Sequence, residues 1–477
     1  MLATRFSRLL ISATVTGLLL LGCKGHGSGS SIPQSLTNWT WESGADGANS
    51  SGYYTAIGTS TTTGQPAGRY SAMTWKDTSG NFWVFSGAGA PNDMWKFNTT
   101  TTDWTWVSGN QVGGLAGTSV YPGIYPSTPG TALSSNLPGQ RNAGATWVDS
   151  SGNFWMFGGY GIDANGLSGY LNDLWSYNVG TGNWTWVSGS NQASGLAGAP
   201  VWGTQGVPST TNQPNPRSNA AFWTGTNGMF YMLGGEGFLG GASGIQNDLW
   251  QYNPTTHEWT YLSGSQTFNA SGVYGTLGTA SASNHPGARH STTTWVDSAG
   301  NLWLYGGIGY DSVGSAGELG DLWKYTPASG STSATWTWVS GSSTVNNIGV
   351  YGTNAVASTS NLPGARSGAS GWIDNAGNIW LFGGYGINYD GTLTSLNDLW
   401  VFTVTAGTWT WYNGSYIGGN AGVYGTYQSL STTNSPGSRY YGSTWQDTSN
   451  NFWLFGGLGI DAAGTTGRLA DLWKFYQ

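Results

Sequence analysis

The sequence has little charge, a single cysteine and few apolar residues for its length. Only 7% of its 477 residues are charged, 14 basic and 21 acidic, against roughly 25% in an ordinary soluble domain. Apolar residues make up only 38% of the chain, which fits neither a helical bundle nor a membrane channel. A net charge of −7 without a basic run argues against nucleic acid as a partner. One cysteine also permits no disulfide within the chain.

Glycine and aromatic residues are abundant instead. The chain contains 80 Gly and 29 Trp, and aromatic residues make up 14% of it. Disordered chains are rich in small polar residues but poor in aromatics. The composition therefore predicts a folded protein that is rich in strands and loops.

The N-terminal segment is typical of an export signal. A basic start precedes an apolar stretch shorter than the roughly 20 residues that a spanning helix needs. Leu20-Leu21-Gly22-Cys23 resembles the lipobox of bacterial lipoproteins. The resemblance implies that residues 1–22 are removed and Cys23 is lipidated, and Lys24 after it favours the outer membrane. Residues 23–37 would then be a flexible Gly/Ser tether. The alternative is an ordinary cleaved signal peptide.

Six repeats follow this segment, each about 72 to 77 residues long. Each repeat has four short runs of alternating large side chains bounded by Gly, Asn or Asp, which predicts four strands. In the fourth repeat these runs are residues 291–295, 302–307, 321–325 and 336–339. One arginine opens each repeat: Arg69, Arg141, Arg217, Arg289, Arg366 and Arg439.

The repeats resemble those of kelch-type β-propellers, the architecture shared by the central domain of galactose oxidase. The double glycine after the second strand and the tryptophan of the outer strand carry this resemblance, which covers residues 38–477. The last repeat lacks its outer strand, whereas Asn38-Trp39-Thr40-Trp41 supplies one at the start. We therefore predict a single all-β domain, a six-bladed propeller with four antiparallel strands per blade, closed by this N-terminal strand.

The connections between blades, together with those between the second and third strands, are the long ones, and all of them emerge on one face. Long loops in a compact domain are often functional, so we expect the working face there. Packing over the blades is the alternative. Residues 88–91 form an unusually short loop in blade one, which predicts a notch beside that blade and a ligand groove in the notch.

The six arginines follow the long connections, and six aspartates open the third strands on the same face. One interpretation is that each arginine pairs with an aspartate and fixes the loops. The other is a basic ring that binds an acidic sugar or the carboxylate of a partner, and this makes all six arginines candidate ligand contacts. The aspartates are Asp93, Asp173, Asp248, Asp321, Asp398 and Asp471.

Aromatic side chains in the long connections suit stacking on sugars or contact with a protein. We predict ligand contacts at Tyr121, Tyr125, Tyr274 and Trp202. Trp202 is the one tryptophan that falls outside the repeat pattern. Glu236 follows a double glycine where other blades have tyrosine, which makes it a candidate general base.

These features predict a monomeric, non-enzymatic lipoprotein of the cell envelope that binds a glycan or a protein through the long-loop face. The alternative is a sugar-modifying enzyme similar to the kelch-fold sialic acid mutarotase, with Glu236 as base and Arg217 holding a carboxylate. Four histidines and one cysteine at the lipid site do not supply the copper ligands of galactose oxidase. We therefore expect no metal, no other cofactor, and membrane contact only through the lipid.

Overall fold

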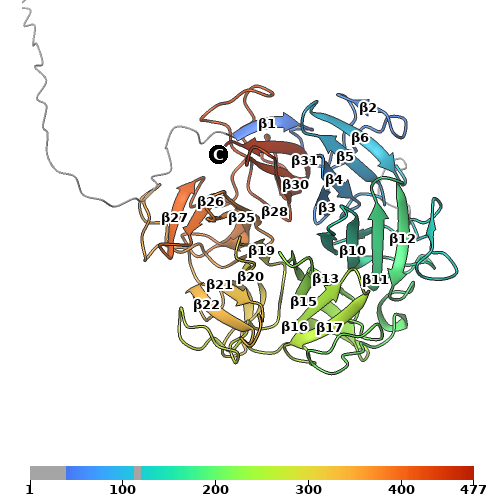
Figure 1. The fold of residues 1–477 in the computed structure, drawn as a ribbon. Coiled ribbons are helices and arrows are strands. Elements are labelled where there is room, and N and C mark those ends of the chain that lie inside the picture. The colour runs from blue at the N-terminus through green and yellow to red at the C-terminus, as the bar shows by residue number, and fades with distance from the viewer. Residues whose placement is uncertain (1–38, 112–119) are drawn as a thin grey trace, which may run out of the picture. The chain divides into compact units, whose positions relative to one another are not determined.

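The computed structural model describes residues 39–111 and 120–477, so the predictions for residues 1–37, including Cys23, lie outside the described part. Six antiparallel sheets are arranged in a ring around a central channel (Figure 1). One short 3-10 helix, η1 (Ser194–Leu196), is the only helix among the described residues. None of the described chain forms a helix that is long and apolar enough to cross a membrane. The prediction of an all-β, six-bladed propeller is confirmed.

Each blade has four main strands, taken here from the channel outward. The innermost strands are β3 (Met73–Lys76), β9 (Ala145–Val148), β14 (Ala221–Thr224), β19 (Thr293–Val296), β24 (Ser370–Ile373) and β29 (Ser443–Gln446). The second strands are β4 (Phe82–Phe85), β10 (Phe154–Ile162), β15 (Phe230–Leu239), β20 (Leu302–Tyr310), β25 (Ile379–Ile387) and β30 (Phe452–Ile460). The third strands are β5 (Met94–Asn98), β11 (Ser168–Asn178), β16 (Ala242–Asn253), β21 (Ala316–Thr326), β26 (Leu393–Thr403) and β31 (Thr466–Phe475). The outer strands are β6 (Asp103–Ser108), β12 (Asn183–Ser188), β17 (Glu258–Ser263), β22 (Thr335–Gly341), β27 (Thr408–Asn413) and β1 (Trp39–Ser43).

Two-residue strands extend the blades at both edges. Five of them begin with a repeat arginine and pair with the second strand above the innermost strand: β8 (Arg141–Asn142), β13 (Arg217–Ser218), β18 (Arg289–His290), β23 (Arg366–Ser367) and β28 (Arg439–Tyr440). Two others, β2 (Ser60–Thr61) and β7 (Ala132–Leu133), pair with the outer strands β6 and β12.

In five of the six blades an aspartate fixes the turn between the first two strands. In blade two, Asp149 accepts hydrogen bonds from the backbone N–H of Asn153 at 2.9 Å and from the indole N–H of Trp155 at 2.9 Å. An aspartate that bonds its own turn in this way favours the tight connection over continued strand. The same contacts recur around Asp297 and Asp374.

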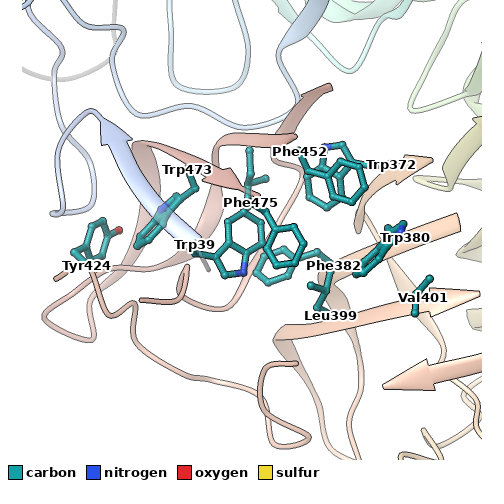
Figure 2. Close-up of a cluster of buried hydrophobic side chains, with 11 residues drawn as sticks. Trp39, Trp372, Trp380, Phe382, Leu399, Val401, Tyr424, Phe452, Trp473 and Phe475 are labelled. Carbon is teal, nitrogen blue, oxygen red and sulfur yellow. The ribbon is translucent and has the colours of Figure 1, made fainter. Parts of the chain in front are cut away.

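The N-terminal strand closes the ring. β1 pairs antiparallel with β31, with Trp39 opposite Phe475 and Trp41 opposite Trp473. Trp39 is only 2% exposed and packs between blades five and six, 5.4 Å from Phe382 and 5.1 Å from Phe475 between ring centroids (Figure 2). The predicted closure by the segment around Trp39 is confirmed.

The long connections between blades lie along the outer strands. The segment before blade four donates from Ser281 N–H to the carbonyl of Trp336 at 3.1 Å, and the side chain of Asn284 donates to the same carbonyl at 3.3 Å. Blades three and five have the same pair of contacts at Trp259 and Trp409. These segments satisfy strand edges that would otherwise be open to other chains. Packing over the blades, the alternative interpretation, accounts for this part of the long connections.

A closed ring of backbone hydrogen bonds surrounds the channel. The residue two positions after each repeat arginine has a positive φ of 51° to 60°, and each donates its N–H to the carbonyl of the equivalent residue in the preceding blade, at 2.7 to 3.0 Å. Left-handed φ is costly for residues other than glycine, so the ring itself must stabilise this conformation. Its members are Ser71, Ala143, Asn219, Ser291, Gly368 and Tyr441.

Candidate functional site

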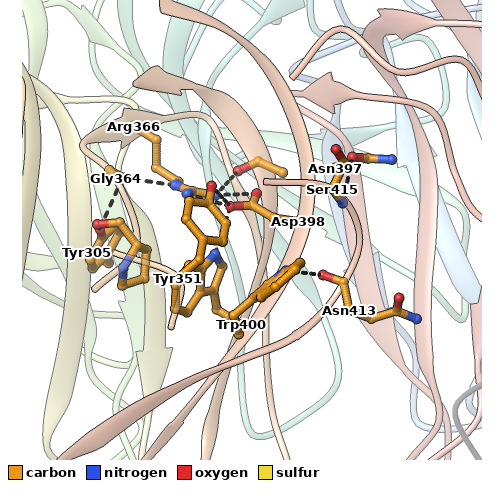
Figure 3. A network of polar contacts seen from close by, with 12 residues as sticks. Tyr305, Tyr351, Gly364, Arg366, Asn397, Asp398, Trp400, Asn413 and Ser415 are labelled. Atoms are coloured by element: carbon orange, nitrogen blue, oxygen red, sulfur yellow. Dashed lines mark hydrogen bonds and ion pairs between the residues drawn. The ribbon is translucent and has the colours of Figure 1, made fainter. Parts of the chain in front are cut away.

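The six repeat arginines are buried in ion pairs with the six aspartates. In blade five the guanidinium of Arg366 contacts both carboxylate oxygens of Asp398 at 2.7 and 2.8 Å, and it also donates to the carbonyls of Gly364 and Gly383 (Figure 3). Both side chains are 0% exposed. Asp398 also accepts from the hydroxyl of Tyr351 and the indole N–H of Trp400, each at 2.7 Å. We call this set of four side chains the blade pin.

The blade pins correct one of the two interpretations of the arginines. Equivalent bidentate pairs occur in every blade, and all twelve side chains are at most 1% exposed. A buried guanidinium whose donors are already occupied cannot bind an external anion. The prediction of ligand contacts is therefore wrong for these arginines, which fix the loops to the sheets: Arg69, Arg141, Arg217, Arg289, Arg366 and Arg439.

Two of the predicted loop aromatics also belong to the blade pins. The hydroxyls of Tyr125 and Tyr274 donate to Asp173 and Asp321 at 2.7 and 2.6 Å. Burial raises the pKa of both hydroxyls, and the nearby aspartates raise it further. These two tyrosines bind their own scaffold, which corrects their assignment as ligand contacts.

Trp202 occupies the pin position of blade three, so it does not escape the repeat pattern. Its ring stacks on Trp250 with centroids 5.3 Å apart and meets Tyr261 at 5.1 Å. Trp202 has no hydroxyl to donate to Asp248, and in this blade the side-chain oxygen of Asn215 accepts a hydrogen bond from the guanidinium of Arg217. Trp202 is half-buried scaffold rather than a free aromatic anchor.

The remaining predicted site residues lie apart from the pins. Tyr121 is half-buried and donates to the carbonyl of Gln111 at 3.0 Å, and its role in binding stays a prediction. Glu236 pairs with Ser218 in the ladder, while Arg217 pairs with Gly237. Successive side chains on a strand point to opposite faces, so Arg217 turns away from Glu236 and into its pin. The proposed cooperation of Arg217 with Glu236 is therefore wrong.

The channel holds a cavity of about 160 Å³ among the innermost strands. Small side chains such as Ala72, Gly144 and Thr146 line it, and Tyr441 is its largest side chain. The Tyr441 hydroxyl lies 2.9 Å from Oγ of Ser291. A Cβ on Gly368 would approach Cδ1 of Tyr441 to 2.7 Å. The ring of Tyr441 thus lies over Gly368, at the end of the channel nearest the long loops, which we call the channel mouth.

Four half-buried tyrosines are in consecutive contact at this mouth. Ring centroids lie 5.2 Å apart from Tyr385 to Tyr440, 5.2 Å from Tyr440 to Tyr441, and 6.2 Å from Tyr441 to Tyr70. Tyr70, Tyr440 and Tyr441 follow the arginines of blades one and six by one or two residues. We call these four residues the tyrosine cluster. The sequence pattern did not indicate this cluster, because three of its tyrosines are next to the repeat arginines and not in the long loops.

Ionisable groups line the opposite side of the mouth. Nδ1 of His290 lies 2.9 Å from Oγ of Ser291, and burial lowers the pKa of this imidazole. Glu318 is only 6% exposed and receives one hydrogen bond from Ser367 at 3.3 Å, while its second carboxylate oxygen has no partner among the described residues. Burial raises the pKa of Glu318 to about 8, against smaller opposing effects of Ser367 and Arg366.

Glu236 also belongs to this ionisable side. The hydroxyl of Tyr170, in the preceding blade, hydrogen-bonds to the Glu236 carboxylate, and burial together with this contact raises the pKa of Tyr170. Within residues 39–111 and 120–477, no group of three His, Cys, Asp or Glu side chains could hold a metal ion. The mouth therefore offers aromatic faces on one side and hydrogen-bonding groups on the other.

Arg468 is a further residue that the sequence-based search missed. It is half-buried in β31 and lies beside the short loop of blade one, where a Cβ on Gly89 would come within 2.3 Å of its Cδ. Among the described arginines it alone stands outside the repeat pattern. That departure from the repeat was the available signal.

The described chain is thus a six-bladed β-propeller with a tyrosine-lined channel mouth. No family model matches the chain. The solved structure of YjhT is similar, with a TM-score of 0.51 and 16% sequence identity over 86% of this chain and 95% of that one. At this identity the similarity shows the fold alone. The human multiple epidermal growth factor-like domains protein 8 is 34% identical over 135 residues, which are 28% of this chain and only 4% of that protein.

Proposed function

We propose that this protein is a kelch-type propeller of the bacterial cell envelope that binds carbohydrate at the channel mouth without transforming it. The observation that carries the proposal is the tyrosine cluster, in which each ring contacts the next across blades five, six and one. Aromatic faces pack on the apolar faces of sugar rings, and binding sites combine such faces with a few well-placed polar groups. At the channel mouth these polar groups are His290, Glu236 and Glu318.

Binding is tested by screening the protein on a glycan array and titrating the strongest neutral ligand by calorimetry. Tyr440→Ala removes a ring from the middle of the tyrosine cluster, and we expect it to weaken binding about tenfold or more. Tyr53→Ala is the matched control, since Tyr53 is 57% exposed on a connection that packs along the outer strand. Equal affinity for the wild type and Tyr440→Ala would contradict the proposal, as would the lack of any glycan ligand.

A sugar-modifying enzyme is the second candidate. It is supported by the position of Glu236 at the channel mouth, where Tyr170 donates to its carboxylate. A carboxylate within reach of a bound sugar can act as a general base. Comparing sugar anomerisation rates of the wild type and Glu236→Gln separates the two candidates. An anomerisation rate that is lower with Glu236→Gln than with the wild type favours the enzyme. A wild-type rate equal to the rate without protein favours binding alone.

Export and lipidation at Cys23 are part of the proposed function and are supported by the sequence before the propeller. Cys23 is the only cysteine of the chain and follows Leu20-Leu21-Gly22. We expect Cys23→Ser to move the protein from the membrane fraction to the soluble fraction and to abolish labelling by a fatty-acid analogue. Retention of both the membrane location and the label would contradict this assignment.

A further inference from the structure

Arg468 differs from every other described arginine in having a guanidinium without a partner. The six repeat arginines each bind an aspartate in two places at 2.7 or 2.8 Å. Within the described ranges, no hydrogen bond or ion pair reaches the side chain of Arg468, whose backbone alone is bonded, to Asn49. Arginine is ionised at any physiological pH and presents a planar fork of donors. An unpaired guanidinium at half-burial is therefore poised to bind an anion.

The residues equivalent to Arg468 in blades two and four make side-chain contacts with the following blade. At the equivalent position of blade two, Tyr170 reaches across to the next blade and hydrogen-bonds to Glu236. Blade four has Glu318 there, which receives a hydrogen bond from Ser367 of the next blade. In both cases the following blade supplies the partner. This position thus joins neighbouring blades at the channel mouth.

Blade one lacks the acceptor that Arg468 would need. Ala88 pairs with Tyr70 in blade one, just as Glu236 pairs with Ser218 in blade three, so Ala88 stands where blade three has its carboxylate. A methyl group accepts no hydrogen bond. The donor is therefore present at the junction of blades six and one, but the acceptor is missing.

The short loop of blade one leaves this guanidinium open to the mouth. β4 ends at Phe85 and β5 begins at Met94, without the strand extensions that lengthen the hairpin of β10 and β11 to Ile162 and Ser168. The Arg468 side chain lies against the backbone of Gly89, whose φ is +90°, and a Cβ there would collide with its Cδ and Nη1. The predicted notch beside blade one is thus occupied by an arginine.

Arg468 also stands in register with the tyrosine cluster. In blade six, Tyr440 pairs with Leu458 and Leu458 pairs with Arg468. Cross-strand partners project from the same side of a sheet. Tyr440 and Arg468 are therefore about 10 Å apart in the sheet, two strand spacings.

We infer that Arg468 binds the carboxylate of an acidic sugar whose ring packs on the tyrosine cluster. This inference rests on the proposed carbohydrate function and names the ligand class, a uronic acid or another sugar that carries a carboxylate. The ligand supplies the acceptor that Ala88 does not. Such a contact is charge-assisted and matches the bidentate geometry that arginine and carboxylate favour.

The test compares a glucuronate-terminated disaccharide with its glucose-terminated counterpart by calorimetry on the full chain. We expect the acidic sugar to bind more tightly, and Arg468→Gln to weaken it about tenfold or more without affecting the neutral sugar. Lys76→Gln is the matched control, because it removes one positive charge from an exposed residue at the opposite end of the innermost strand. Its affinity should equal that of the wild type.

A second variant supplies the missing acceptor from within the protein. Ala88→Glu copies the arrangement of Glu236 and should engage Arg468 internally, so that affinity for the acidic sugar falls while a thermal transition shows that the fold persists. Equal binding of both sugars, unchanged by Arg468→Gln, would overturn the inference and leave the proposed function standing. Absence of binding by both sugars and by the whole array would overturn both.

Discussion

The hydroxyl of Tyr441 lies 2.9 Å from Oγ of Ser291, although the two residues are 150 positions apart in the chain. The contact passes over Gly368, the member of the backbone ring that belongs to the blade between them. All three residues have positive φ and take part in the same ring of hydrogen bonds. A single side chain thereby narrows the channel at the mouth, and the geometry depends on glycine at position 368.

We expect Gly368→Ala to destabilise the fold by about 2 kcal/mol, from overpacking against Tyr441. Ala143 has the same place in the ring, with φ of 56°, so alanine itself is compatible with this backbone. The opposite substitution at this equivalent position, Ala143→Gly, is the control and should change stability little. Urea unfolding measures both. A cost of Gly368→Ala that persists in a Tyr441→Ala background would show that contact with the ring is not its cause.

Closure of the ring should contribute strongly to stability. Trp39 is buried between blades five and six against Phe382 and Phe475 (Figure 2), and we expect Trp39→Ala to cost about 3 to 5 kcal/mol. Deletion of residues 38–43 should lower the melting temperature further, because it also exposes the edge of β31. Leu133→Ala, at a side chain that is 43% exposed, is the control. An unchanged melting temperature on deletion would rule out the closure.

The contacts within the blade pins predict that different substitutions in them lower the free energy of unfolding by different amounts. Asp398→Asn leaves the guanidinium of Arg366 buried without its counter-charge and should cost about 3 to 5 kcal/mol. Tyr351→Phe removes one hydrogen bond to the Asp398 carboxylate and should cost about 2 kcal/mol. Trp202→Phe is the matched control in blade three, where no such hydroxyl is present, and should cost less than Tyr351→Phe. Equal costs in the two blades would contradict a role for the hydroxyl.

Glu318 predicts a dependence of stability on pH. Its pKa rises from 4.5 to about 8 on folding, mainly because the carboxyl is buried. Between these two pH values the folded state holds a proton that the unfolded state has released, so the contribution of Glu318 to stability falls as pH rises from 4.5 to 8. Glu318→Gln should therefore raise the melting temperature more at pH 8 than at pH 5. An equal effect at both pH values would show that Glu318 does not titrate in this way.

The repeat period made most of the fold predictable. Arginines at regular spacing, four runs of alternating large side chains and a final repeat short of one strand led to six blades and to pairing of the segment around Trp39 with the last blade. The strands follow from patterns among neighbouring residues, whereas the number of blades and the closure follow from comparing the repeats with one another. The pairing of arginines with aspartates was one of two open interpretations, and burial decided between them.

The site was less predictable for a physical reason. A repeat pattern identifies equivalent positions but not the side to which a side chain turns, so Arg217 and Glu236 looked like neighbours although they project from opposite faces of one blade. Tyr125, Tyr274 and Trp202 looked like free loop aromatics until the structure placed them against the pins.

The sequence by itself determined the number of blades and the order of the strands, since these depend on a pattern that recurs in every repeat. Only the tertiary structure decided what lies at the channel mouth, because that surface joins single residues from all six blades. Tyr441 reaches Ser291 over Gly368, and the Arg468 side chain lies against Gly89 in the short loop of blade one. These departures from the repeat form a common site only because the closed ring brings distant parts of the chain together.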